Sequence, residues 1–283
     1  MSLLKVILLA IVQGLAELLP VSSSAHVVVA EKLMGLDPSS PAMTLLLVML
    51  HTGTMFAVIV YFWRQWRETF FSSAEEFKHF AWLAILATAL TGIVGEILIR
   101  IIEKTIFRGY PHAQIEDLFG HLEIVAPALA AAGILILIAG LKEGRTPNSG
   151  GSDAISSGQA GVIGFVQGLC LPFRGFSRSG ATISVGLLQD IQRRRVEAFS
   201  FALAVILTPP VVAREALRLR HADTTGFAHA ALPSLLGAAF AFLAGLLALK
   251  WLSAWLERGR WYYFGIYCLA ASVVVFLLHR HGY

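Results

Sequence analysis

The side chains of this chain that can do chemistry gather at two places, the first of which lies near the amino terminus. Gln13 and Glu17 stand four positions apart and therefore share one face of a helix. Pro20 stops this helix, and Ser22 is a suitable N-cap for the next one. The first turn of that next helix holds Ser23, Ser24 and His26. Because a helix start offers unpaired N–H groups and a positive dipole end, we expect this segment to bind an anion such as phosphate.

The second place is residues 172–182, a segment rich in glycine and serine that opens with a proline. Gly175 and Gly180 allow the backbone to approach a ligand closely. Ser177 or Ser179 can cap the helix that follows. The remaining polar side chains of the segment are Arg174, Arg178 and Thr182. A guanidinium group grips two phosphate oxygens at once and keeps its charge, so this segment also predicts phosphate binding.

The two places belong to an internal repeat. Val12-Gln13-Gly14-Leu15 recurs as Val166-Gln167-Gly168-Leu169, and each copy leads into a proline and a serine cluster. A polar linker at 142–158 separates the halves 1–141 and 159–283. Three candidate membrane spans lie between the copies, so the second copy must enter the membrane from the opposite face. We therefore predict an inverted repeat, with a re-entrant helical hairpin and three transmembrane helices in each half and a site where the breaks meet.

The composition places these elements in a membrane. Of 283 residues, 57% are hydrophobic and 14% are charged, against about 45–50% and 25% in soluble domains. This excludes a water-soluble enzyme, a disordered chain and a coiled coil, and predicts an all-α polytopic membrane protein. Apolar runs of about 20 residues mark the spans, at 43–62, 80–101, 122–141, 229–250 and 261–279, with a shorter run at 197–213.

Charge and cysteine content point to no other partner. The net charge is +4, and the basic residues form short clusters between apolar runs, which is typical of membrane flanks. We therefore expect the bilayer as a partner and no nucleic acid. Cys170 and Cys268 lie far apart in apolar surroundings and imply neither a disulfide nor a metal site. The distribution of basic residues over the loops leaves the orientation open.

Some of the polar residues also have a purely structural interpretation. Serines and glycines in membrane helices often serve close packing. His51 lies in the middle of a span and is expected to bond to a neighbouring helix, and Glu96 is expected to pair with Arg100. Ionisable groups at membrane depth cost at least about 2.5–3.5 kcal/mol each and usually mark function. Packing therefore does not explain a carboxylate, a histidine and arginines at two related breaks.

The motifs resemble those of the bacterial undecaprenyl-pyrophosphate phosphatases, the bacitracin-resistance family. They are Gln13–Glu17 running into Leu19–His26, and Gly175–Thr182, and the resemblance covers essentially the whole chain. It implies a multi-pass enzyme of the bacterial inner membrane that removes the terminal phosphate of undecaprenyl pyrophosphate, a polyprenyl pyrophosphate lipid. The product is the lipid carrier for peptidoglycan and other envelope polymers. Bacitracin resistance on overproduction is implied as well.

The resemblance further implies roles for individual residues and a divalent cation, Mg²⁺ or Ca²⁺. Glu17 serves the metal or acid–base chemistry, with Gln13 as the neighbouring metal position, and Ser23 and His26 serve the catalytic step. The resemblance assigns pyrophosphate binding to Arg178, Ser177, Ser179 and Thr182. Two further candidates, Ser22 and Arg174, follow from their side chains and their places at the breaks. There are two departures from the family pattern. Gln13 replaces a second carboxylate, and Arg174 stands where a proline is usual.

The sequence leaves three alternatives open. Either Ser23 attacks the terminal phosphorus with His26 as base, or His26 attacks directly and forms a phosphohistidine. The rival function is a polyprenyl-phosphate transporter or flippase, which has the same inverted-repeat architecture but needs no nucleophile and releases no phosphate. The Ser23–His26 pair favours the enzyme. A homodimer is compatible with the sequence, which does not decide it.

Overall fold

The computed structural model describes residues 2–36, 41–105, 121–145, 152, 154–222 and 224–282, which form helices joined by short turns. In these ranges β-structure is limited to an isolated bridge between Ser152 and Ile191. The helices are α1 Leu3–Leu18, α2 Ser23–Leu33, α3 Pro41–Thr69, α4 Ala74–Thr105, α5 Leu122–Arg145, α6 Ser157–Cys170, α7 Arg178–Leu188, α8 Arg193–Ala222, α9 Thr224–Glu257 and α10 Tyr262–Arg280. The all-α prediction is confirmed.

Five helices are long and apolar enough to cross a membrane. They contain the stretches Met43–Thr69, Ala74–Thr105, Leu122–Glu143, Ala231–Glu257 and Tyr262–Arg280. At 1.5 Å per residue, a stretch of 27 residues is about 40 Å long and exceeds the roughly 30 Å hydrocarbon core. The five clear spans predicted from the sequence are thereby confirmed by length and composition. The shorter run at 197–213 lies within α8, a helix of 30 residues that continues into polar sequence at both ends.

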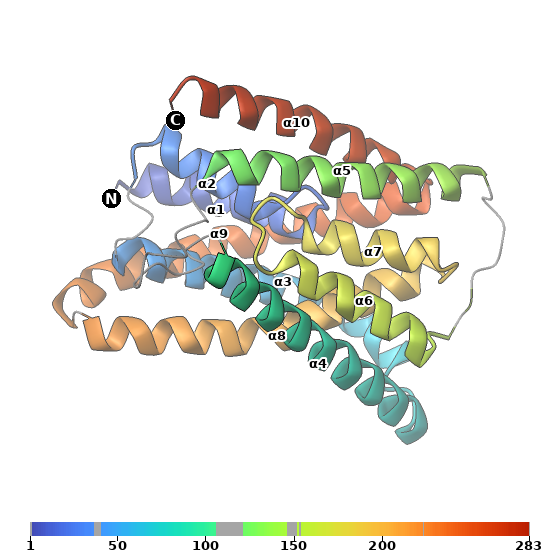
Figure 1. Cartoon of the computed structure of the whole chain (residues 1–283). Helices are drawn as coiled ribbons and strands as arrows, with labels where there is room; N and C mark the ends of the chain where they lie inside the picture. Colours follow the sequence, from blue (N-terminus) through green and yellow to red (C-terminus); the bar gives the residue numbers. More distant parts are fainter. Residues whose placement is uncertain are drawn as a thin grey trace.

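The long helices lie side by side, and both chain ends lie at the same end of the bundle (Figure 1). The closest neighbours are α3 with α9 and α5 with α10. α3 also packs against α8. The bundle therefore joins helices from the two halves of the chain at several places.

The four short helices form two hairpins inside this bundle. α1 has 16 residues, α6 has 14, and α2 and α7 have 11 each, so each is at most about 24 Å long and too short to span. The hairpin α1–α2 enters from the end where the chain begins, and α6–α7 enters from the other, so that their turns face each other (Figure 1).

Each hairpin packs on a long helix of the other half, because α1 lies along α9 and α6 lies along α4. This reciprocal packing of each hairpin on the other half is what an inverted repeat predicts. The symmetry relation between 1–141 and 159–283 stays a prediction. Of the predicted linker at 142–158, residues 146–151 and 153 lie outside the described residues.

Candidate active site where two helix breaks meet

The first break has a strained backbone. α1 ends at Leu18, and Pro20 cannot continue it. Ser22 then adopts φ 67° and ψ 92°, and its Oγ accepts a hydrogen bond from the Ala25 N–H at 3.4 Å. The predicted N-cap is confirmed. Positive φ is uncommon for a residue with a side chain and costs of order 1–3 kcal/mol, and residues strained in this way cluster at functional sites.

The second break depends on a glycine. Gly175 has φ 105°, and a Cβ there would lie 2.4 Å from the carbonyl oxygen of Val125, so only glycine fits. Ser177 caps α7, because its Oγ accepts a hydrogen bond from the Gly180 N–H at 3.2 Å. Of the two predicted caps, Ser177 is therefore the one used. Ser179 lies in the first turn of the helix and is left to make a different contact.

The two breaks touch each other through three polar contacts. The Gly175 N–H donates to Ser24 Oγ at 3.3 Å, and Ser179 Oγ donates to the Leu19 carbonyl at 3.4 Å. The third contact is an ion pair between Arg178 Nη2 and Glu17 Oε1 at 3.1 Å. The two clusters found in the sequence, more than 140 positions apart, therefore form one site.

Glu17 lies at the centre of this site. Its Oε2 accepts hydrogen bonds from Ser23 Oγ at 2.5 Å and from Gln13 Nε2 at 3.2 Å, while Oε1 faces Arg178. The side chains of Glu17 and Arg178 are 18% and 22% exposed. At this depth their attraction is screened far less than at a protein surface. The carboxylate is thus held in place, and the Ser23 hydroxyl is already bonded to a proton acceptor.

Arg178 has one guanidinium nitrogen without a hydrogen-bond partner among the described residues. Its Nη2 binds Glu17, but its Nη1 is buried and has no hydrogen-bond partner in the described part of the chain. A buried guanidinium nitrogen without a partner is costly, and an anionic oxygen would satisfy it. The helix that carries Arg178 is braced by Thr182, whose fully buried hydroxyl donates to the Arg178 carbonyl at 2.8 Å and pairs with Ser200 at 2.6 Å.

Both ring nitrogens of His26 are engaged away from Ser23. Nδ1 lies 2.8 Å from the carbonyl oxygen of Ser22, and Nε2 lies 2.7 Å from the hydroxyl of Tyr267 on α10. Among the described contacts, Ser23 bonds to Glu17 and not to His26. The structure thus places His26 beside the site but does not pair it with the Ser23 hydroxyl.

Sequence reasoning missed two residues of the site. His51 Nε2 lies 3.8 Å from Glu17 Oε2 on the neighbouring helix α1, whereas the sequence interpretation expected a bond to a neighbouring helix but no place in the site. Its position in mid-span was a usable signal, because ionisable groups there usually mark function. Tyr267 gave no such signal, since a tyrosine in an apolar run is unremarkable. By contrast, the expected pair of Glu96 and Arg100 is confirmed at 2.8 Å.

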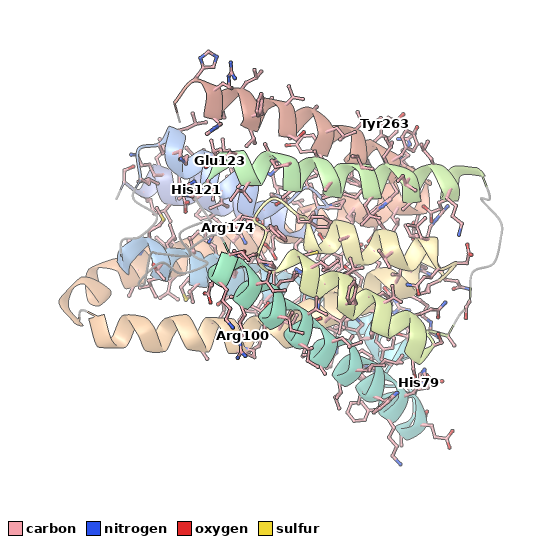
Figure 2. The ribbon with its side chains drawn as sticks, in the orientation of Figure 1. His79, Arg100, His121, Glu123, Arg174 and Tyr263 are labelled. Carbon is pink, nitrogen blue, oxygen red and sulfur yellow. The ribbon has the colours of Figure 1, made fainter. Side chains whose placement is uncertain are left out.

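Arg174 lies in the turn between α6 and α7, toward the same end of the bundle as Arg100, His121 and Glu123 (Figure 2). Its charge acts on the carboxylate of Glu31 in α2. Glu31 is fully buried, and neither of its oxygens has a hydrogen-bond partner in the described ranges. Arg174 therefore has a counter-charge on the other hairpin, which the sequence did not predict.

The oxygen donors beside Glu17 suit a hard cation only in part. Gln13 and Ser23 add an amide and a hydroxyl to the single carboxylate, and such oxygens are ligands that Mg²⁺ and Ca²⁺ accept. Across the described residues, no three His, Cys, Asp or Glu side chains come together as a metal cluster. A cation here would therefore need further oxygens from a bound substrate.

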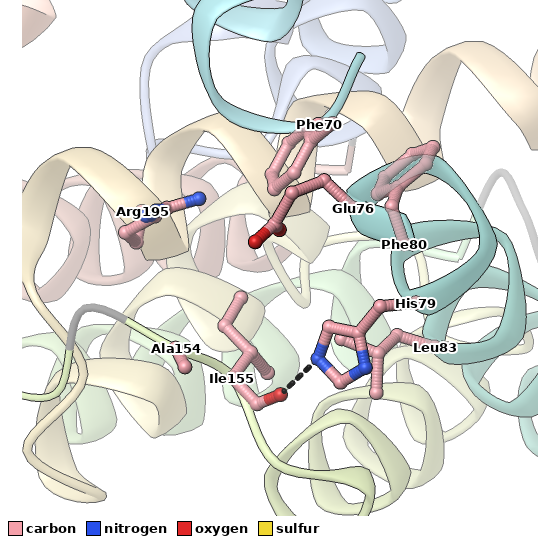
Figure 3. Close-up of a pocket in the computed structure, with 8 residues that line it drawn as sticks. All are labelled: Phe70, Glu76, His79, Phe80, Leu83, Ala154, Ile155 and Arg195. Carbon is pink, nitrogen blue, oxygen red and sulfur yellow. Dashed lines mark hydrogen bonds between the residues drawn. The ribbon is translucent and has the colours of Figure 1, made fainter. Parts of the chain in front are cut away.

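A separate cavity of about 280 Å³ lies elsewhere in the molecule (Figure 3). It is lined by Phe70, Glu76, His79, Phe80, Leu83, Ala154, Ile155 and Arg195. His79 Nε2 lies 3.1 Å from the Ile155 carbonyl, and His79 and Arg174 lie at opposite ends of the bundle (Figure 2). No residue of the two breaks lines this cavity, so it is distinct from the site around Glu17.

The fold and the site together define an integral membrane protein with a polar, arginine-containing site at the meeting point of two broken helical hairpins. The chain belongs to the family of the bacitracin resistance protein BacA, whose sequence model matches residues 6–274. It is thus a multi-pass protein of the bacterial inner membrane.

Several relatives are similar over nearly their whole length. The chain is 59% identical to undecaprenyl-diphosphatase 2 of Acinetobacter baylyi, over 98% of each chain. It is 34% identical to the undecaprenyl-diphosphatase of Desulfatibacillum aliphaticivorans, over 97% of this chain and 99% of that one. The undecaprenyl-diphosphatase of Halothermothrix orenii is 31% identical, over 98% of each.

Proposed function

We propose that this chain hydrolyses undecaprenyl pyrophosphate to undecaprenyl phosphate and inorganic phosphate. It thereby recycles the lipid carrier for peptidoglycan and envelope synthesis and confers bacitracin resistance. Family membership and the names of the relatives support this function. The observation that carries it is the hydrogen bond of 2.5 Å between Ser23 Oγ and Glu17, a carboxylate that is also paired with Arg178.

The pyrophosphate binds between the starts of α2 and α7. Their first N–H groups have no partners within the helices, and their positive dipole ends favour an anion. Arg178 Nη1 supplies a charged donor that lacks a protein partner in the described ranges. Ser22, Ser177, Ser179 and Thr182 shape these helix starts. Arg174 as a second pyrophosphate contact stays a prediction.

Ser23 is the nucleophile and Glu17 is its base. Glu17 Oε2 takes the proton of the Ser23 hydroxyl as Oγ attacks the terminal phosphorus. The bond from that phosphorus to the bridging oxygen breaks, and undecaprenyl phosphate leaves with the proton that Glu17 passes on. Arg178 stabilises the charge on the transferred group, which is the main contribution of a protein to phosphoryl transfer. The bonds of His26 to Ser22 and Tyr267 argue against His26 as base or nucleophile in this first step.

Water completes the reaction. It attacks the phosphorus bound to Ser23, the bond between that phosphorus and Oγ breaks, and inorganic phosphate is released. Glu17 Oε2, which is bonded to Ser23 Oγ, takes a proton from this water, and the proton returns to Ser23 Oγ. His26 stands three residues after Ser23 in α2, and its part in the reaction stays a prediction.

A divalent cation, Mg²⁺ or Ca²⁺, would be held by Glu17 and Gln13 with oxygens of the pyrophosphate. When bound, it would neutralise part of the pyrophosphate charge. The homodimer and the lack of a nucleic-acid partner stay predictions.

Release of inorganic phosphate from a polyprenyl pyrophosphate by the purified protein in detergent tests the function. Glu17→Gln keeps the shape of the side chain but removes the base, so phosphate release should fall at least about 100-fold. Glu68→Gln is the matched control, because Glu68 also pairs with an arginine, Arg64, but on the exposed surface. A wild-type protein that moves polyprenyl phosphate across vesicles and releases no phosphate would establish the transporter instead.

A further inference from the structure

His51 on α3 presents a nitrogen lone pair to the carboxylate of the site. Its Nδ1 lies 2.8 Å from the carbonyl oxygen of Leu47, one turn earlier on the same helix. Because a carbonyl oxygen can only accept, Nδ1 carries the proton, and in the neutral ring Nε2 keeps its lone pair. Nε2 is also the atom that lies 3.8 Å from Glu17 Oε2.

The distance between these two atoms suits two ligands of one metal ion. It is too long for a hydrogen bond, in which nitrogen and oxygen are about 2.7–3.2 Å apart. Two ligands of a divalent cation commonly lie about 3–4 Å apart, because each stands about 2.0–2.6 Å from the ion. A cation between Glu17 Oε2 and His51 Nε2 would therefore bind both lone pairs.

The surroundings hold both side chains in the orientation of metal ligands. A histidine that binds a metal commonly donates its other N–H to a backbone carbonyl, which is the bond that His51 makes to Leu47. Arg178 holds Glu17 through Oε1 and leaves Oε2 facing the histidine. The side chain of His51 is 45% exposed, so an ion can reach the pair from water. His26 differs, because both of its nitrogens already have partners.

The donors at this place indicate the class of cation. Glu17 and His51 supply one oxygen and one nitrogen, and the hydroxyl of Ser23 lies 2.5 Å from Glu17 Oε2. Water or pyrophosphate oxygens would complete the shell, as is usual for cations that act on phosphates. Mg²⁺ and Ca²⁺ take oxygen ligands, whereas an imidazole nitrogen favours first-row transition metals.

We propose that His51 is a ligand of the divalent cation at Glu17, and that it makes the site prefer a first-row transition cation such as Mn²⁺ over Mg²⁺ and Ca²⁺. The proposal rests on the proposed function, which places a cation beside Glu17. It extends that function by adding a nitrogen ligand from a long helix outside both hairpins.

Electron paramagnetic resonance of Mn²⁺ bound to the full-length protein in detergent, without substrate, tests the proposal. Electron spin echo modulation detects the ¹⁴N nucleus of an imidazole bonded to Mn²⁺, and we expect it in the wild type. His51→Gln should remove it and raise the Kd for Mn²⁺ about tenfold or more, since losing even the hydrogen-bond partner of a ligand costs about 10–100-fold. Ca²⁺ should then displace Mn²⁺ at lower concentration than from the wild type.

His121→Gln is the matched control. His121 also lies beside a carboxylate, with Nδ1 2.6 Å from Glu123 Oε1, but this pair is on the exposed surface near the start of α5 (Figure 2). This variant should keep the ¹⁴N signal and the wild-type Kd.

Three results would overturn the proposal. One is Mn²⁺ bound to the wild type without a ¹⁴N signal, which needs no variant to be measured. Another is loss of the signal in His121→Gln, which would place the ion at the surface pair. The third is a wild-type Kd in His51→Gln, which would leave His51 as an imidazolium paired with Glu17. If the wild type binds Mn²⁺ through His51 but releases no phosphate with any cation, the proposed function fails and the metal site stands.

Discussion

The hairpins α1–α2 and α6–α7 have the same frame and different chemistry. In each, a serine caps a short helix of 11 residues, Ser22 before α2 and Ser177 before α7. The first residue of each helix then binds Glu17, Ser23 through a hydroxyl and Arg178 through a guanidinium. The common backbone arrangement brings both helix starts to the carboxylate of Glu17. The first residue of each helix then supplies a hydroxyl in α2 and a guanidinium in α7.

The second positions of the two helices lock the hairpins together. Ser24 accepts a hydrogen bond from Gly175 in the opposite turn, and Ser179 donates to Leu19 in the other. Each of these two serines bonds to the backbone of the opposite break, so both contacts hold the hairpins together. The division is therefore clear: the nucleophile and its base come from the first hairpin, and the cation that binds phosphate comes from the second.

Replacing Ser23 with alanine should have the largest effect, because it removes the nucleophile from the first hairpin. We expect phosphate release to fall by about 10⁴-fold or more, as for other enzymes that lose an attacking hydroxyl. Ser24→Ala, the neighbouring change, should cost less than about tenfold, since it removes one hydrogen bond between the hairpins. A Ser23→Ala variant that retains activity while His26→Ala is dead would identify the phosphohistidine route.

Arg178→Ala removes the contribution of the second hairpin and should lower kcat by about 10²–10³-fold, the usual cost of losing one charge-stabilising donor. Arg178→Lys should recover only part of this loss, because an ammonium lacks the planar fork that holds Glu17 and an oxygen together. Steady-state kinetics on both variants measures the effect. Equal activity of Arg178→Lys and the wild type would mean that only the charge matters.

Replacing each glutamine of the repeated motif with glutamate should favour cation binding at Gln13 and lower the stability at Gln167. Gln13 donates to Glu17, so Gln13→Glu creates a second carboxylate at the site. The concentration of Mg²⁺ needed for half-maximal activity should fall about tenfold. Gln167 is fully buried and donates to Thr91 Oγ1 at 3.0 Å, away from the site.

Gln167→Glu places a charge at a fully buried position, and should lower the free energy of unfolding by about 3 kcal/mol or more. Thermal unfolding in detergent measures the stability, and a magnesium titration of activity measures the other variant. If Gln13→Glu left the magnesium requirement unchanged, Gln13 would not be a cation ligand.

The sequence predicted what is local and missed what is not. The caps, the prolines and the apolar runs act over a few residues, so Ser22, the breaks and the spans could be located. The pairing of Glu17 with Arg178 could be expected only because the repeat implied that the breaks meet. His51 and Tyr267 come from long helices whose rotation depends on packing across the bundle. No spacing rule relates α10 to α2, so the partner of His26 had to come from the structure.

The two caps allow the smallest and most direct comparison of the hairpins. Ser22 has φ 67°, whereas Ser177 has φ −60°, a value any residue adopts. Ser22→Gly loses little of the cap and relieves the strain, so the protein should become about 0.5–1 kcal/mol more stable. Ser177→Gly relieves nothing and makes the unfolded chain more flexible, so stability should fall by about 1 kcal/mol. Opposite shifts in the thermal midpoint are expected. If both variants melt lower by the same amount, the backbone at Ser22 stores no strain and the two breaks differ only in their side chains.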